Sequence, residues 1–313
     1  MLRELRGGLT ALALVVAGVL VAVSVDLGIP GQALLQSLRF HIAAVLLGLV
    51  LLLLIGGAWR RALLFLLAFA VSAGQGAAII YRQQEAREAL VAAPSKPLLK
   101  LLSFNILTSN PNGEGIARFV AGSGADVVVL LEASPIAAYV DVLRAAYPYF
   151  GGCEDGSPCG GVVILSRTPL ADVSVQSMSG IWLIRLVTAT TEIGGQRVNL
   201  VAAHLVKPYF DEFAAEELAK LGAVIGRLEG PVVLAGDFNA AAWSEAIERL
   251  MTRQQLLPGP GYPATWPVRL GPLGVPIDNI FTQAPLVIDK VDALGDAMGS
   301  NHRGLLAEIR VAD

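Results

Sequence analysis

Apolar residues are distributed unevenly along this chain of 313 residues. Three long apolar runs, Leu9–Val25, Phe40–Gly57 and Ala62–Ile80, occupy the N-terminal part, whereas from Leu98 onward short apolar runs alternate with amphipathic stretches. Each long run has about the 17–25 residues that a helix needs to cross the hydrocarbon layer. No polar face interrupts these runs as it would in a helix packed on a soluble core. The pattern therefore predicts a membrane domain of three transmembrane helices over residues 1–81.

Basic residues at the ends of the runs indicate an orientation. Arg3 and Arg6 precede the first run, and Arg60 and Arg61 lie in the short loop before the third, so both segments are expected in the cytoplasm. An odd number of crossings then places everything after Tyr81 outside. The first run alone would also fit a cleaved signal peptide, but two similar runs follow it directly, which favours a multi-pass membrane domain.

The remainder of the chain divides into a stalk and a globular domain. Residues 82–97 are polar and then rich in Ala, Pro and Ser, which predicts a juxtamembrane stalk. In residues 98–313 the apolar runs predict strands at Leu98–Phe104, Asp126–Leu131, Gly161–Leu165, Trp182–Thr190, Arg197–Ala203, Val232–Ala235, Ile277–Thr282 and Leu305–Val311. Amphipathic stretches predict helices at Glu114–Ala121, Pro135–Ala146, Asp211–Leu228 and Trp243–Met251. We expect a mixed α/β domain of two packed sheets flanked by helices.

Charge separates the two parts further. Residues 1–96 contain 8 Lys and Arg against 4 Asp and Glu, a net charge of +4, whereas residues 97–313 contain 15 against 22, a net charge of −7. Sequence-independent binding to nucleic acid depends on Lys and Arg contacts to phosphates. The acidic balance of the outer domain therefore argues against a nucleic-acid partner and makes a periplasmic nuclease the weaker of the enzyme hypotheses.

The two cysteines, Cys153 and Cys159, lie six residues apart in a segment rich in glycine. This spacing allows a small disulfide loop, which would persist in an oxidising compartment and agrees with an outer location. A pair of unrelated free thiols is the alternative. A metal site lacks a third ligand nearby in the sequence.

Polar residues suited to metal binding or acid–base chemistry recur at the ends of predicted strands. They are Asn105, Glu132, His204, Asp237 with Asn239, Asp278 and His302. Each alone has an ordinary structural explanation, since Asn and Asp start turns and Glu caps helices. Their repeated position at strand ends within one domain predicts a common cleft.

In this order these residues resemble the endonuclease/exonuclease/phosphatase superfamily, which includes deoxyribonuclease I and sphingomyelinases. The resemblance covers about Lys100 to Val311, and its most specific motifs are Gly236-Asp237-Phe238-Asn239, Ile277-Asp278 and the block Ser300–Arg303. The segments Cys159–Arg167 and Thr265-Trp266-Pro267 are similar to a membrane-anchored bacterial branch. The resemblance implies a deoxyribonuclease I-like two-sheet α/β sandwich, placed outside a bacterial inner (plasma) membrane, and phosphoester hydrolysis.

The residue types fit such chemistry with Mg²⁺, or with Mn²⁺ as the alternative. A hard cation prefers oxygen ligands, which Glu132 would supply as a carboxylate and Asn105 as an amide. A carboxylate hydrogen-bonded to imidazole, here Asp278 and His302, fixes the histidine tautomer, and the resemblance places this pair beside the phosphate.

The remaining roles concern the attacking water and the phosphate. Asp237 would orient or deprotonate the water, Asn239 would hold the phosphate, and His204 would donate to the phosphate or to the leaving group. Either Asp237 or His302 could be the general base, and the sequence leaves this choice open.

One residue departs from the family pattern, which has Ser-Asp-His where this chain has Ser300-Asn301-His302. Asn301 keeps a carbonyl oxygen but carries no charge, so it is at most a weak metal ligand. A catalytically silenced binding or scaffold domain of the same fold is therefore the alternative to an enzyme. Retention of the other site residues favours a hydrolase, either a phosphodiesterase or a phosphatase. An acidic domain tethered near lipid fits a lipid headgroup or a small periplasmic phosphate ester as substrate, and no residue selects between the two.

Overall fold

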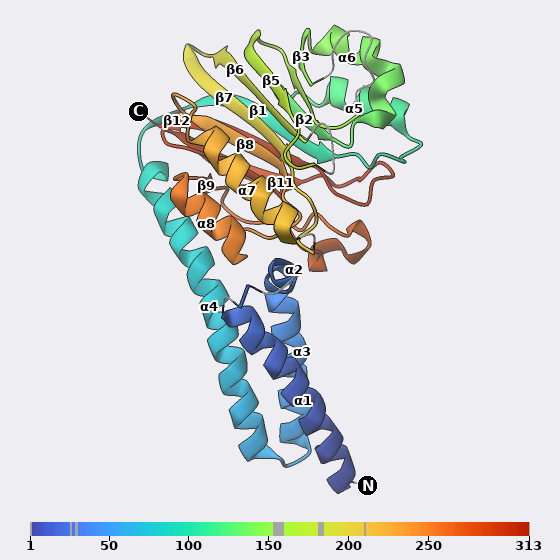
Figure 1. Ribbon diagram of the computed structural model, residues 1–313, viewed down its shortest axis with the longest axis vertical. Coiled ribbons are helices and arrows are strands. Elements are labelled where there is room, and N and C mark those ends of the chain that lie inside the picture. The colour runs from blue at the N-terminus through green and yellow to red at the C-terminus, as the bar shows by residue number, and fades with distance from the viewer. Residues whose placement is uncertain are drawn as a thin grey trace.

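The computed structural model describes residues 2–25, 27–28, 31–152, 160–180, 185–209 and 211–312. A bundle of helices forms one end of the molecule and an α/β sandwich the other, with the N-terminus at the far end of the bundle (Figure 1). The bundle consists of α1 (Leu2–Ser24), α2 (Gln32–Ser37), α3 (Arg39–Ile55) and the first part of α4 (Trp59–Val91).

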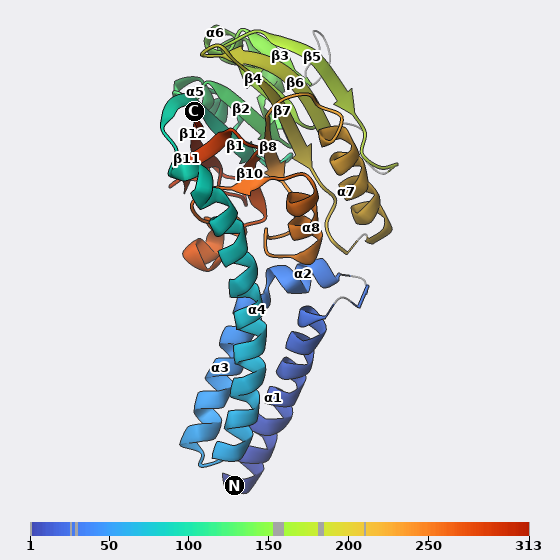
Figure 2. The ribbon, with the colours of Figure 1, turned by 90° about the vertical axis from the view of Figure 1, so that its left-hand side faces the viewer.

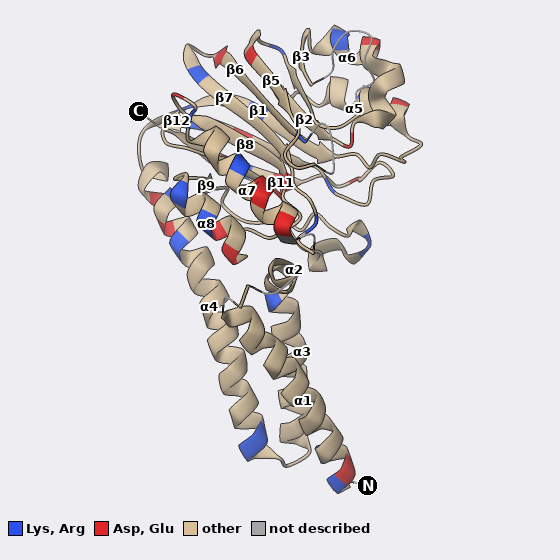
Figure 3. Cartoon of the chain, in the orientation of Figure 1, with Lys and Arg blue, Asp and Glu red and all other residues tan. Residues whose placement is uncertain are grey.

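The bundle is held together by a seam of apolar side chains. Leu20, Leu46, Leu53 and Phe65 are buried between the helices, while most of their other apolar residues face outward. Lys, Arg, Asp and Glu lie toward the ends of the bundle, and its middle consists of other residues (Figure 3). Among the described residues, α1 and α4 are long and apolar enough to cross a membrane, and α3 is a shorter apolar helix of 17 residues. The third predicted span stays a prediction.

The predicted stalk, residues 82–97, is largely helical. Helix α4 continues through it to Val91, and strand β1 begins at Ser95. The stretch is rich in Gln, Glu, Arg and Ala, which are strong helix formers, and the sandwich holds it. Gln84 donates from Nε2 to the Gly259 carbonyl at 3.0 Å, and Arg87 donates from Nη2 to the Ile288 carbonyl at 2.8 Å.

Two six-stranded sheets form the sandwich, and all eight predicted strands occur in them. The first sheet has the order β11 (Leu286–Ala293), β12 (Leu305–Ala312), β1 (Ser95–Asn105), β2 (Val127–Leu131), β4 (Val163–Ser166), β3 (Tyr149–Gly151). The second has the order β5 (Leu170–Gln176), β6 (Leu186–Ile193), β7 (Gln196–His204), β8 (Val232–Asp237), β10 (Asp278–Thr282), β9 (Leu257–Pro258). The predicted two-sheet α/β architecture is thereby confirmed.

Four strands lack a clear sequence signal, and all four lie at or beside a sheet edge. β3 and β9 are very short, β5 has several exposed residues, and β11 loses its apolar character after Ile288. Edge strands bury few side chains, so their hydrophobic pattern is weak. The sequence prediction missed them for this reason.

Side chains alternate between two apolar layers along the central strands. In β1, Leu101 packs between the sheets and Leu102 packs on the outer face, beneath the helices. The outer face of the first sheet is covered by α5 (Gly113–Gly122), the 3₁₀ turn η1 (Ser134–Tyr139) and α6 (Val140–Ala146), and that of the second by α7 (Asp211–Ile225) and α8 (Glu245–Arg253). The predicted helix Pro135–Ala146 is thus divided into a 3₁₀ turn and a short α-helix. A further 3₁₀ segment, η2 (Val268–Leu273), follows α8.

The short helix α2 fastens the bundle to the sandwich. Gln36 accepts hydrogen bonds from the Trp243 indole N–H at 3.1 Å, through its carbonyl, and from the Glu245 backbone N–H at 3.0 Å, through its side chain. Ser37 Oγ accepts a third from the Ala241 backbone N–H at 2.9 Å. Gln36 and Ser37 are both buried. Bundle and sandwich therefore share a polar interface as well as an apolar one.

Removing the Gln36 side chain should weaken this junction. In Gln36→Ala the backbone N–H at the start of α8 loses its acceptor, and a lost helix cap costs about 1 kcal/mol. We expect a lower thermal-unfolding midpoint for the full-length protein in detergent micelles. Gln196→Ala, at a hairpin turn where the glutamine donates to the adjacent Arg197 carbonyl, is the control. Equal midpoints for the two variants would contradict the bridging role.

Candidate active site

Strand direction brings the predicted residues to one edge of the sandwich. β1 runs parallel to β2, and β7 runs parallel to β8. Asn105 ends β1 and Glu132 follows β2, while His204 and Asp237 end β7 and β8. The carboxyl ends of parallel strands are where α/β folds place their ligand sites.

The register of the second sheet sets three of these side chains at one level. His204 is opposite Asp237 in the β7–β8 ladder, and Asp237 is opposite Asp278 in the β8–β10 ladder. Aligned residues on neighbouring strands point to the same face. The three side chains therefore form a row, in which His204 Nε2 lies 3.6 Å from Asp237 Oδ2.

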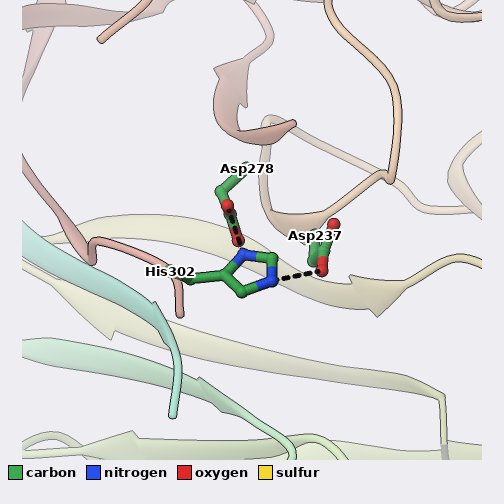
Figure 4. A group of neighbouring side chains, drawn as sticks. All are labelled: Asp237, Asp278 and His302. Carbon is green, nitrogen blue, oxygen red and sulfur yellow. Dashed lines mark hydrogen bonds and ion pairs between the residues drawn. The ribbon is translucent and has the colours of Figure 1, made fainter. Parts of the chain in front are cut away.

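His302 reaches this row from the loop before β12. Its Nδ1 lies 2.9 Å from Asp278 Oδ2 and its Nε2 lies 3.8 Å from Asp237 Oδ2, so the ring stands between the two carboxylates (Figure 4). Ser300 fixes the loop, because its Oγ donates to the Asn105 carbonyl at 2.7 Å and accepts from the His302 N–H at 3.1 Å. The predicted pairing of Asp278 with His302 is present in the structure.

Asn105 connects this cluster to Glu132. Its Nδ2 lies 3.2 Å from Glu132 Oε1 and 3.1 Å from Asp237 Oδ2, and the Thr108 backbone N–H donates to Glu132 Oε2 at 2.8 Å. Glu132 has a φ of 55°, a left-handed conformation that non-glycine residues adopt only when their surroundings enforce it.

Asn239 completes the set. Its backbone N–H donates to Asp237 Oδ1 at 2.8 Å and its Nδ2 donates to the Leu205 carbonyl at 2.8 Å. The structure thus brings together all seven polar residues that the strand-end pattern singled out.

Burial and neighbouring charges set the pKa values of Asp237 and His302, the two titrating groups at the centre of the cluster. Burial, with the charge of Asp278, raises the pKa of Asp237 to about 7 against the opposing effect of His302. Burial alone would lower the pKa of His302, but the carboxylates of Asp278 and Asp237 outweigh it and raise this pKa to about 9. His302 is therefore an imidazolium at neutral pH, and Asp237 titrates close to neutrality.

The pKa values of His204 and Glu132 are lowered instead. Burial, and then the nearby positive charge of Arg185, lower the pKa of His204 well below its ordinary value, so this imidazole is neutral at pH 7. Burial would raise the pKa of Glu132, yet the hydrogen bonds from Thr108 and Asn105 prevail and its pKa is lowered. Glu132 is accordingly a charged carboxylate.

Asn301 lies apart from this network. Its side chain is exposed and its carbonyl accepts a hydrogen bond from the Val268 N–H at 3.1 Å. Among the described residues it makes no hydrogen bond to another predicted site residue. Its predicted role as a weak metal ligand stays a prediction. The predicted disulfide partners Cys153 and Cys159 fall outside the described residues.

Arg185 is a supporting residue that the sequence reasoning missed. Its guanidinium donates to the carbonyls of His204 and Leu205, at 2.5 Å each, and the side chain is buried. It thereby holds the backbone that carries His204. A signal existed, since Arg185 is a charged residue within an otherwise apolar predicted strand, and buried charges require partners.

The donor set fits a divalent cation. Ligand atoms of Asp237, Asp278 and His302 lie within 4.8 Å of one another, and Glu132 joins them through Asn105. Carboxylate oxygens are the ligands that a hard cation prefers, and oxygen-rich sites of this kind suit Mg²⁺.

The sequence comparison decides the family. The model of the Endonuclease/Exonuclease/phosphatase family matches residues 102–302, from β1 to His302. The chain belongs to this family. Every residue of the cluster lies within the matched range. The comparison with curated proteins found no match.

Solved structures agree with this fold. An endonuclease/exonuclease/phosphatase from Beutenbergia cavernae is 24% identical, with a TM-score of 0.58 over 69% of this chain and 72% of its own. Sphingomyelinase C from Streptomyces griseocarneus is 18% identical, with a TM-score of 0.51 over 68% and 99%. A beta toxin from Staphylococcus aureus with bound magnesium ions is also 18% identical, with a TM-score of 0.51 over 67% and 99%. At these identities the likeness establishes the fold.

The opposite shifts of the two buried histidines can be measured by NMR, because the chain has three histidines. In metal-free, histidine-labelled protein, we expect His302 to stay protonated until the pH approaches its raised pKa of about 9. His204 should stay neutral to well below pH 6.5. His302→Gln and His204→Gln assign the signals. Asp278→Asn should lower the pKa of His302, because it removes the facing charge. A His302 signal that titrates below pH 6.5 in the unsubstituted protein would contradict this geometry.

Proposed function

We propose that this protein is a membrane-tethered, metal-dependent hydrolase of phosphoester bonds, with Mg²⁺ as the metal and Mn²⁺ as an alternative. The observation that carries the proposal is the buried cluster of Asp237, Asp278 and His302, linked through Asn105 to Glu132. Members of the family generally hydrolyse phosphoester bonds, and its fold neighbours include a sphingomyelinase and a toxin with bound magnesium ions.

The pKa shifts favour Asp237 as the general base. A base works best when its pKa lies near the working pH, and the pKa of Asp237 is raised to about 7. Asp237 would accept the proton of the attacking water, while the Glu132 carboxylate holds the cation and Asn105 Nδ2 orients Glu132 and Asp237. When bound, the cation neutralises charge on the phosphate and on the leaving oxygen.

His302 and His204 would act as donors rather than bases. His302 is charged, and Asp278 holds its Nδ1 at 2.9 Å, which directs Nε2 toward the site where Asp237 also points. An N–H⁺ in this position stabilises negative charge that develops on a phosphate oxygen. Neutral His204 would donate to the phosphate or to the leaving group, and Asn239 would hold the phosphate.

The silenced-domain alternative rests on Asn301 alone. The Asn301 side chain is exposed, and the buried cluster beside it is complete. Asparagine in place of the family's aspartate at this position therefore leaves the proposed base and donor in place. This arrangement favours turnover over a scaffold role.

The tether consists of α1 and α4, with α3 proposed as a third span. We retain the predicted orientation, in which the N-terminus is cytoplasmic and the sandwich lies outside a bacterial inner membrane. The acidic outer domain makes a nucleic-acid substrate a poor fit. A phosphoester at or near the membrane surface is the proposed substrate.

The catalytic roles predict a non-additive pattern of substitutions. His302→Gln and Asp278→Asn should each lower kcat/KM for a chromogenic phosphodiester by about 10²–10⁴-fold. The double variant should be scarcely worse, because the two residues act as one unit. EDTA should remove activity, Mg²⁺ should restore it, and Glu132→Gln should respond poorly to added metal. Asp172→Asn, at an exposed position of β5, is the matched control. Activity indifferent to EDTA and to all three positions would place the reaction elsewhere.

The proposed topology follows from the positions of Arg3, Arg6, Arg60 and Arg61. An alkaline phosphatase reporter, which is active only outside the inner membrane, should be active when fused after Asp313 and inactive when fused at Arg60. A cytoplasmic β-galactosidase reporter at the same two positions should give the reverse pattern. Phosphatase activity of the Arg60 fusion, but not of the Asp313 fusion, would contradict the proposed topology and imply the opposite orientation.

A further inference from the structure

A cavity of about 700 Å³ lies between α7, α8 and α2, outside the site described above. Helices α7 and α8 form its walls, and α2 lies below them at the outer end of the bundle (Figure 2). Its volume is within the range of about 300–1,000 Å³ that is usual for ligand sites. We call this cavity the α7–α8 groove.

Helices α7 and α8 approach each other along the groove at Gly222, where an added Cβ would lie 3.5 Å from both Leu250 Cδ1 and Gln254 Nε2. Toward the first turns of the helices, Ala33 and Gln36 of α2 line the groove.

The walls of the groove are mainly apolar, and the side chains on the α7 wall are small. Ala215, Ala219 and Ala223 follow one another at every fourth position of α7, line the groove and are exposed. Ile247 and Leu250 face them from α8. Surface helices normally carry long polar residues at exposed positions. The alanines leave open a space that such side chains would fill.

The floor of the groove adjoins the active-site loops. Leu205 and Phe238 line it and directly follow His204 and Asp237 in the chain. Asn239 Nδ2 donates to the Leu205 carbonyl at 2.8 Å, which ties the two loops together. A ligand in the groove therefore lies beside the backbone that holds the proposed catalytic residues.

The other boundary of the groove belongs to the apolar bundle. Gly28 and Gln32, between α1 and α3, contribute to its lining, and α1 is one of the two helices suited to cross a membrane. The groove thus extends from the outer end of the bundle to the loops after β7 and β8. Its charged lining residues are Glu245, Arg249 and Arg253, and Arg249 is paired with Glu245 at 3.1 Å.

We propose that the α7–α8 groove binds one hydrocarbon chain of a membrane lipid phosphoester, whose phosphate reaches the cluster of Asp237, Asp278 and His302. The inference rests on the proposed function and assigns its substrate to the lipids. The apolar wall selects the chain, and the position between bundle and active site orients it. A lipid held in this way presents its phosphate without leaving the membrane surface.

Binding can be tested without turnover. Full-length protein is placed in vesicles of phosphatidylethanolamine and phosphatidylglycerol that contain a phospholipid with a photoactivatable acyl chain. Cross-links should map to peptides of α7 and α8, and Ala219→Trp, which fills the groove, should reduce them at least five-fold. Ala145→Trp introduces the same residue at an exposed position of α6 and should leave them unchanged. The smaller change Ala215→Leu should reduce cross-linking in part, and it serves if the tryptophan variant fails to fold.

Turnover provides the second readout. The rate on a long-chain phospholipid, divided by the rate on a soluble chromogenic phosphodiester, should fall at least ten-fold in Ala219→Trp and stay constant in Ala145→Trp. Cross-links that are unchanged in folded Ala219→Trp, or that occur elsewhere on the protein, would overturn the groove assignment. So would an unchanged rate ratio.

The outcomes separate this inference from the proposed function. A protein that cleaves neither substrate but cross-links at α7 and α8 contradicts the hydrolase and supports a lipid-binding groove. A protein that cleaves the soluble substrate, with cross-links and rate ratio indifferent to Ala219→Trp, keeps the hydrolase and removes the groove. Displacement of the photoactivatable lipid by a soluble peptide, but not by excess lipid, would assign the groove to a peptide and overturn the proposal.

Discussion

Two buried carboxylates that face each other across neighbouring strands determine the organisation of the edge that carries the candidate site. Asp237 and Asp278 are opposite in the β8–β10 ladder and are almost fully buried. Two like charges in such a place are costly unless other groups compensate them. His302 does so with its imidazolium, and Asn105 with its amide. His302 and Asn105 thus offset the negative charge of the two carboxylates.

The same arrangement of charges determines which of these groups are protonated at neutral pH. His302 takes the charged form because two carboxylates face it, and Asp237 holds its proton more tightly because it is buried beside Asp278. Pairs of groups with divergent pKa values are the usual signature of divided acid and base roles. His204 is kept neutral by burial and by Arg185. One carboxyl group with a raised pKa, one charged imidazolium and one neutral imidazole therefore lie at a single edge.

The N-terminal helices take part in building this edge. α2 bonds to the Ala241–Glu245 segment that follows the Asp237–Asn239 motif, and Phe40 of α3 packs edge-on against Trp243 with ring centroids 5.2 Å apart. His41 lies 2.8 Å from the Leu273 carbonyl, at the end of the η2 segment whose Val268 bonds to Asn301. The bundle is thus a structural neighbour of the loops that carry the candidate site, and the α7–α8 groove arises at this junction.

Local patterns in the sequence were sufficient for the central strands, for the apolar helices and for the residue types of the site. Strands such as β2 and β8 are continuous apolar runs because both faces are buried, and Asp237, Asp278 and His302 lie in short motifs readable without a structure. Tertiary structure decided what depends on distant segments. The continuation of α4 to Val91 requires acceptors at Gly259 and Ile288, the direction of each pKa shift requires the facing carboxylates, and the groove requires α2 to lie beside α7 and α8. A sequence records the propensity of each segment, but hydrogen-bond partners, charge neighbours and cavities arise only when segments far apart in the chain come into contact.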